Sequence, residues 1–114
     1  MGHYPPLFPS PLSVAHSVDL PARWKRQGWK VKVRDRERVE PPHVTVMFKS
    51  ESWRFGLREL DFLDKSPSPR RVPKAIVEHL LACAVRCEAA REWDAMYPHN
   101  PVPVYDDCDA CPDD

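Results

Sequence analysis

Four cysteines are the residues of this 114-residue chain whose type and spacing most clearly indicate chemistry. They form two pairs in the last third of the sequence, Cys83 with Cys87 and Cys108 with Cys111. Residues four apart share one face of a helix, and CxxC is the ligand spacing of a zinc knuckle. Two such pairs would fasten the C-terminal segment to a helix, either through one metal ion or through disulfides.

The choice between metal and disulfides depends on the compartment. No apolar run reaches the length of a membrane span, and the first residues lack the basic start and apolar stretch of a signal peptide, so we expect a cytoplasmic protein without a membrane partner. A reducing cytosol disfavours disulfides. One reading that this leaves open is one structural zinc on the candidate ligands Cys83, Cys87, Cys108 and Cys111, with His79 as a substitute ligand. The alternatives are redox sensing and plain packing of the helical pair in the core.

His43 is the second residue that indicates chemistry. It follows Pro41 and Pro42, which impose an extended backbone, and it begins an alternating run that ends at Lys49. A histidine among basic residues is suited to proton transfer at an RNA 2′-hydroxyl or leaving oxygen, with Arg54 stabilising charge on phosphorus. His43 and Arg54 are therefore the catalytic candidates of a metal-independent ribonuclease, although the sequence favours a role without catalysis.

Charge is distributed unevenly along the chain. The 17 basic and 17 acidic residues cancel, so the whole chain has no electrostatic reason to bind nucleic acid. Basic residues nevertheless concentrate between Arg23 and Arg38, and alternation along the expected strands gathers basic side chains on one face of a sheet. Like charges on neighbouring strands repel unless an anion such as RNA phosphate binds them. The nucleic-acid-binding candidates are Lys30, Lys32, Arg34, Lys49, Arg54 and Arg58.

Two alternatives to nucleic-acid binding remain open for this basic face. The side chains would also solvate an exposed sheet surface and discourage edge pairing. In addition, the acidic residues between Tyr105 and Asp114 would compete for the same face if they folded back onto it. An acidic segment of this kind is also typical of a solvated tail.

Three alternating runs and one longer apolar stripe predict the elements that carry these residues. Trp29–Arg34, His43–Lys49 and Trp53–Arg58 each alternate between apolar and polar residues, which indicates half-buried strands joined by short links. Pro73 is suited to begin a helix that runs to about Met96 with apolar residues at helical spacing. We therefore expect an α+β fold, in which a three-stranded antiparallel meander is covered on one face by one long C-terminal helix.

The sequence divides into a folded unit and two flanking segments without regular structure. Residues 1–21 form a proline-rich, extended arm, residues 22–97 a single β-β-β-α domain, and residues 98–114 an extended, acidic, cysteine-containing tail. Proline has no backbone N–H to donate, so the arm cannot form a regular pattern of backbone hydrogen bonds, and we expect it to be dispensable for folding. Its scattered apolar residues, with Trp24 beside them, predict contact with a partner protein.

The stretch from about Lys30 to Trp93 resembles a family of small, uncharacterised bacterial proteins, a domain of unknown function with a Pro-Pro-His-Val-His-Val strand. The matching residues are Pro41, Pro42, His43, Val44 and Val46, and Thr45 replaces the second histidine. The resemblance implies an accessory or interaction module of a bacterial defence or toxin-antitoxin-like system. The arm predicts that this module binds a partner protein, and the basic sheet face offers a site for nucleic acid. An RNA-cleaving toxin using His43 and a zinc-stabilised structural adaptor in a larger complex are the alternatives.

Overall fold

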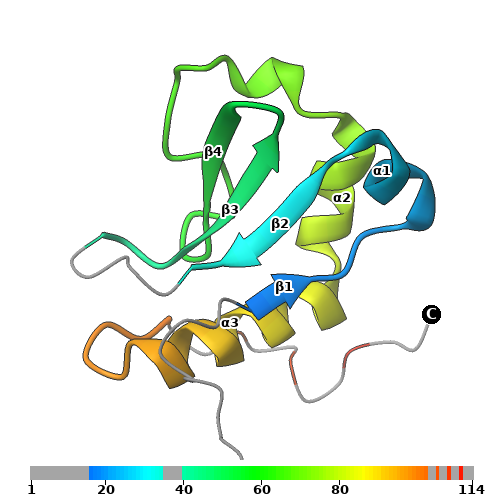
Figure 1. The fold of residues 1–114 in the computed structure, drawn as a ribbon. Helices are drawn as coiled ribbons and strands as arrows, with labels where there is room; N and C mark the ends of the chain where they lie inside the picture. Colours follow the sequence, from blue (N-terminus) through cyan, green and yellow to red (C-terminus); the bar gives the residue numbers. More distant parts are fainter. Residues whose placement is uncertain (1–15, 35–39, 103–104, 106–107, 109–110, 112–114) are drawn as a thin grey trace, which may run out of the picture.

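The computed structural model of the chain describes residues 16–34, 40–102, 105, 108 and 111. Its centre is a four-stranded antiparallel sheet in the order β1-β2-β3-β4 (Figure 1). The strands are β1 (His16–Val18), β2 (Lys30–Val33), β3 (His43–Phe48) and β4 (Glu51–Gly56). The helices are α1 (Ala22–Gln27), the short 3₁₀ helix η2 (Pro69–Arg71), α2 (Lys74–Leu81) and α3 (Cys83–Met96). The α+β class expected from the sequence is therefore confirmed.

The core lies on one face of the sheet. Val31 pairs with Val46, and Val46 pairs with Trp53, so alternation places the apolar residues of three strands side by side. All three side chains are buried, as are Ile76 of α2 and Trp93 of α3 within the same cluster. The three strands predicted from alternating residues thus exist, and the helices cover their apolar face.

The sheet has one strand more than the expected meander. β1 pairs with β2 in antiparallel register, with Val18 opposite Val31, and Leu20 beyond it is only 3% exposed. Residues 16–20 therefore belong to the folded unit, which corrects the assignment of the whole segment 1–21 to an extended arm. A strand of three residues is too short to show periodicity in the sequence. Residues 1–15 of the predicted arm lie outside the described part.

The single long helix expected from Pro73 to Met96 is two helices. Ala82 has extended backbone angles, φ −62° and ψ 138°, and separates α2 from α3. No glycine or proline marks this break, and Ala82 by itself favours helix. The change of direction allows both Ile76 of α2 and Trp93 of α3 to be fully buried. Within the described residues, no helix is both long and apolar enough to cross a membrane.

Candidate functional sites

A polar cavity of about 610 Å³ lies beside β3 and β4. Its lining includes Arg34, Glu40, His43, Thr45, Arg54 and Asp64. The register sets Thr45 opposite Arg54 and His43 opposite Gly56. The structure thus brings both predicted catalytic candidates to one cavity. Three carboxylates of the described residues also line it, and two of them, Glu40 and Asp64, bind Arg54. Glu40 precedes β3 and Asp64 follows β4, and neither position has a sequence pattern that pairs it with an arginine.

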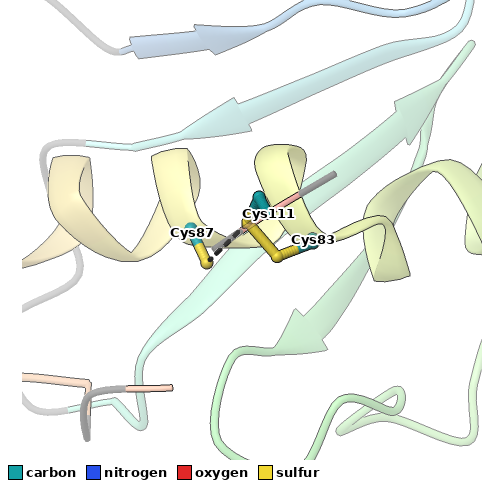
Figure 2. A group of neighbouring side chains, drawn as sticks. All are labelled: Cys83, Cys87 and Cys111. Atoms are coloured by element: carbon teal, nitrogen blue, oxygen red, sulfur yellow. Dashed lines mark hydrogen bonds between the residues drawn. A yellow bond between two sulfur atoms is a disulfide. The ribbon is translucent and has the colours of Figure 1, made fainter. Parts of the chain in front are cut away.

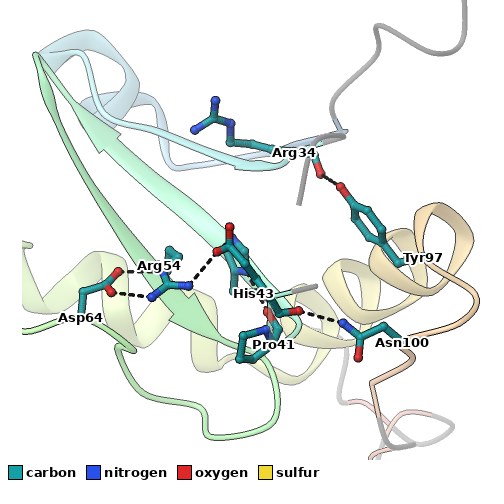
Figure 3. Close-up of polar contacts among 8 residues, drawn as sticks. Arg34, Pro41, His43, Arg54, Asp64, Tyr97 and Asn100 are labelled. Carbon is teal, nitrogen blue, oxygen red and sulfur yellow. Dashed lines mark hydrogen bonds and ion pairs between the residues drawn. The ribbon is translucent and has the colours of Figure 1, made fainter. Parts of the chain in front are cut away.

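Arg54 is held by both carboxylates. Its Nε and Nη2 donate to Asp64 at 2.9 and 2.6 Å (Figure 3). Its Nη1 donates to Glu40 Oε1 at 2.7 Å. These hydrogen bonds raise the pKa of Arg54 above its ordinary value and lower that of Asp64. The guanidinium charge is therefore already balanced. For Arg54 to stabilise charge on a phosphoryl group, a carboxylate would first have to be displaced.

His43 is almost completely enclosed, with 1% of its surface exposed. Its Nδ1 lies 2.8 Å from the carbonyl oxygen of Pro41, which can only accept, so Nδ1 donates and Nε2 keeps the lone pair of the neutral ring. Nε2 lies 4.0 Å from Glu40 Oε1, and the ring centroid lies 5.3 Å from that of Trp93. Burial is the largest cause that lowers the pKa of His43 below 6.5. A neutral ring of fixed orientation suits a base, but its enclosure leaves little access for a substrate.

The lowered pKa of His43 predicts a pH-dependent stability. The unfolded chain takes up a proton near pH 6.5, whereas the folded chain resists it, so the contribution is complete above this pH and is lost as the pH falls below it. We expect the unfolding free energy to decline from about pH 6.5 downward and His43→Gln to flatten this decline. His99→Gln, at an exposed position, is the control. Urea titrations at intervals from pH 7.5 to 5, where Asp64 stays ionised, measure the effect, and equal slopes in both variants would contradict it.

The predicted basic face is only partly assembled. Lys32, Thr45 and Arg54 form one cross-strand row, and Lys30 lies opposite Met47 in the next row. Lys49 instead lies in the turn after β3 with φ 56°, and its Nζ is 5.2 Å from the centroid of the Phe48 ring.

The remaining two basic candidates lie beyond the strand ends. Arg58 follows β4, and its Nη2 donates to Asn100 Oδ1 at 3.1 Å and to the Pro101 carbonyl at 2.9 Å. Arg34 follows β2 and lines the polar cavity, and its carbonyl accepts a hydrogen bond from the Tyr97 hydroxyl (Figure 3). Of the six predicted residues, Lys30 and Lys32 are therefore the ones that the sheet presents without a bound carboxylate.

A second hollow, of about 450 Å³, lies beside β1 and β2 and is lined in part by Lys25, Lys30 and Lys32. Lys25 Nζ forms an ion pair with Asp19 Oδ1 at 3.0 Å. No carboxylate of the described residues lies within ion-pair distance of Lys30 or Lys32. Lys25 was not among the six predicted nucleic-acid-binding residues, because it precedes the first of the strands expected from alternation. We call these three lysines the lysine surface.

All four cysteines come together at α3. Cys83 is bonded to Cys111 and Cys87 to Cys108, with Cα–Cα distances of 5.5 and 5.8 Å. The C-terminal segment is thus fastened to a helix by pairs of cysteines, as the spacing predicted, but by disulfides rather than metal. The two bonds are close neighbours, since Cys111 Sγ lies 3.9 Å from Cys87 Sγ (Figure 2).

Further contacts hold the segment after α3. Trp93 Nε1 donates to the Asn100 carbonyl at 2.7 Å, and Asp94 Oδ1 accepts from the Val102 backbone N–H at 2.7 Å. The Tyr105 hydroxyl donates to the Leu57 carbonyl, and burial raises the pKa of Tyr105 to about 12. The aspartates proposed to cover the basic face, Asp106, Asp107, Asp109, Asp113 and Asp114, lie outside the described residues.

Comparison of the chain with protein-family models, with curated proteins and with solved structures found no match. The resemblance to the bacterial family with the Pro-Pro-His-Val-His-Val strand therefore stays a prediction.

Proposed function

We propose that this chain is a small binding module, without catalytic activity, that holds the phosphate backbone of RNA on the lysine surface. The observation that carries the proposal is the pair Lys30 and Lys32, which have no carboxylate partner among the described residues and line a hollow with Lys25. Ammonium groups donate charge-assisted hydrogen bonds to phosphate oxygens, and each contact releases counterions from the nucleic acid. A phosphate backbone would therefore relieve the repulsion between these lysines.

The spacing of the lysines supports contact with more than one phosphate. Lys30 and Lys32 are two residues apart on β2, so their Cα atoms are separated by about 7 Å along the strand. Lys25 comes from α1 and borders the same hollow. Lys25 is already paired with Asp19 at this hollow, so Lys30 and Lys32 supply the two uncompensated ammonium groups, and their separation suits two phosphates of a polymer.

RNA cleavage by His43 is the alternative function, and the geometry supports it less well. The ring of His43 is 1% exposed, and Arg54 is bound by Asp64 and Glu40. The bacterial defence or toxin-antitoxin-like setting, and a partner protein that contacts the segment 1–21, are proposals that rest on the sequence.

Reversing the charge of the lysine surface should remove RNA binding. In Lys30→Glu/Lys32→Glu two phosphate contacts are lost, so the slope of log K against log salt for single-stranded RNA should become shallower by about 1.4. Fluorescence anisotropy with a labelled oligonucleotide from 50 to 200 mM salt measures this slope. Lys65→Glu/Lys74→Glu makes the same charge change at exposed positions away from the hollow. An equal loss in both variants would show that net charge alone, and not this surface, determines binding.

We further propose that the reduced protein binds one structural zinc through Cys83, Cys87, Cys108 and Cys111. In a tetrahedral site with zinc–sulfur bonds of about 2.3 Å, the sulfurs lie about 3.8 Å apart. Cys87 Sγ and Cys111 Sγ are 3.9 Å apart, and these two sulfurs and that of Cys83 all lie within 4.8 Å of one another. A cytoplasmic location, which the sequence predicts, would keep the thiols reduced and favour the zinc form.

Metal analysis tests the zinc proposal. Protein purified with a thiol-free reductant and dialysed against micromolar zinc should retain close to one equivalent, and Cys108→Ser should lower this content. The oxidised protein is the control and should retain none, because its sulfurs are bonded to one another. A reduced wild-type protein that binds no zinc would exclude the site.

A further inference from the structure

We propose that the two disulfides work as one thiol-exchange centre, in which an external thiol opens Cys83–Cys111 and the freed Cys111 then takes Cys87 from Cys108. The external reactant is a monothiol or dithiol reductant. This activity is independent of RNA binding and does not require zinc.

The burial of the sulfurs favours this order of reaction. Cys87 is 2% exposed, whereas the other three cysteines are partly exposed. A solvent thiol therefore cannot easily reach the Cys87 sulfur. Attack on Cys108 instead would expel Cys87 as a thiolate in buried surroundings, where loss of hydration disfavours the charge. Attack on Cys83 expels the partly exposed Cys111, which makes the outer disulfide the favoured point of attack.

The position of Cys111 then provides the second step. Its Sγ lies 3.9 Å from Cys87 Sγ, so the thiolate released from Cys83 is already beside the buried sulfur (Figure 2). This step expels Cys108, which is partly exposed. Each leaving thiolate on this route thus reaches solvent, and the attack inside the protein is made by a group that needs no access from outside.

The bonds and electrons of the two steps balance. In the first, a thiolate bonds to Cys83 Sγ while the Cys83–Cys111 bond breaks, which gives a mixed disulfide and the Cys111 thiolate. In the second, Cys111 bonds to Cys87 while the Cys87–Cys108 bond breaks, and Cys108 takes up the proton that the external thiol lost. A second external thiol removes the first from Cys83 as an external disulfide. Two electrons have then entered the protein, and the remaining protein disulfide is Cys87–Cys111.

The identity of the disulfide that survives two-electron reduction tests the proposal. Oxidised protein is treated with limiting glutathione at pH 8 with a chelator present, quenched with acid, alkylated and digested. Trypsin cleaves after Arg86 and separates Cys83 from Cys87, and Asp-N cleaves before Asp109 and separates Cys108 from Cys111. Mass spectrometry should find Cys87–Cys111 with Cys83 and Cys108 alkylated. Partial reduction with a phosphine at pH 3, where exchange is suppressed, should leave Cys87–Cys108. If Cys87–Cys108 also survives glutathione at pH 8, the relay is overturned.

Two single variants test the role of Cys111 directly. Cys83→Ser leaves Cys111 as a free thiol beside the intact Cys87–Cys108 bond, and at pH 8 it should convert to a mixture that contains Cys87–Cys111. Cys111→Ser is the matched control, and in it glutathione should reduce Cys87–Cys108 at least 10-fold more slowly than in the wild type. Equal rates in the two proteins would overturn the relay. Should circular dichroism show that either variant fails to fold, the disulfide that mass spectrometry identifies in the wild-type protein still tests the relay.

Discussion

Reduction of both disulfides, with a chelator present to exclude zinc, should lower the melting temperature by about 20 °C. The bonds join residues 28 and 21 positions apart, and a loop of this size contributes about 3 kcal/mol to the unfolding free energy. The two loops overlap, so the second bond adds less than the first. For a domain of about 100 residues, each kcal/mol corresponds to about 4–8 °C. Circular dichroism melts with and without reductant measure the shift.

Adding zinc to the reduced protein separates the effects of the cysteines. If the zinc proposal holds, the metal should restore much of the lost melting temperature, because binding favours the folded state. Cys108→Ser should melt below the wild type in both forms and respond less to zinc. A reduced protein that melts within about 3 °C of the oxidised one would show that the contacts of Trp93, Asp94 and Tyr105 hold the C-terminal segment without the disulfides.

Removal of residues 1–21 should unfold or strongly destabilise the domain. This truncation deletes β1 and exposes the apolar surface that Val18 and Leu20 cover. Each of these side chains contributes about 1.5–3 kcal/mol by burial, so the loss is about 3–6 kcal/mol, before the hydrogen bonds of the β1–β2 ladder are counted. The sequence alone predicts the opposite result, because residues 1–21 have the proline-rich pattern of one extended arm.

Truncation of residues 1–15 is the matched control for this experiment. It keeps β1, Val18 and Leu20, so we expect urea denaturation to give an unfolding free energy within about 1 kcal/mol of the full chain. If the longer truncation were equally stable, β1 would contribute nothing to the core. If the shorter one also unfolded, residues 1–15 would be required for stability.

The strands were predictable because their signal is local. Val31, Val46 and Trp53 occur in alternating runs, and alternation requires only that one face of a sheet be buried. β1 and the break at Ala82 were not predictable in this way. A three-residue strand acquires its hydrogen bonds from β2. The break at Ala82 accompanies the burial of Ile76 and Trp93 in one core cluster, which no local pattern encodes.

The same distinction between local signals and tertiary contacts applies to the candidate sites. The sequence by itself determined which residues could act: a pair of cysteines on a helix, a CxxC pair to meet it, a histidine at a strand start, and lysines on one side of β2. The tertiary structure decided what surrounds them. It set Glu40 and Asp64 against Arg54, enclosed His43 beside Trp93, and added Lys25 to Lys30 and Lys32. Residue type and spacing are properties of the chain itself, so the sequence shows which side chains are capable of chemistry. Burial and ion pairing depend on segments distant in sequence, so only the tertiary structure shows which of these side chains are neutralised and which are exposed.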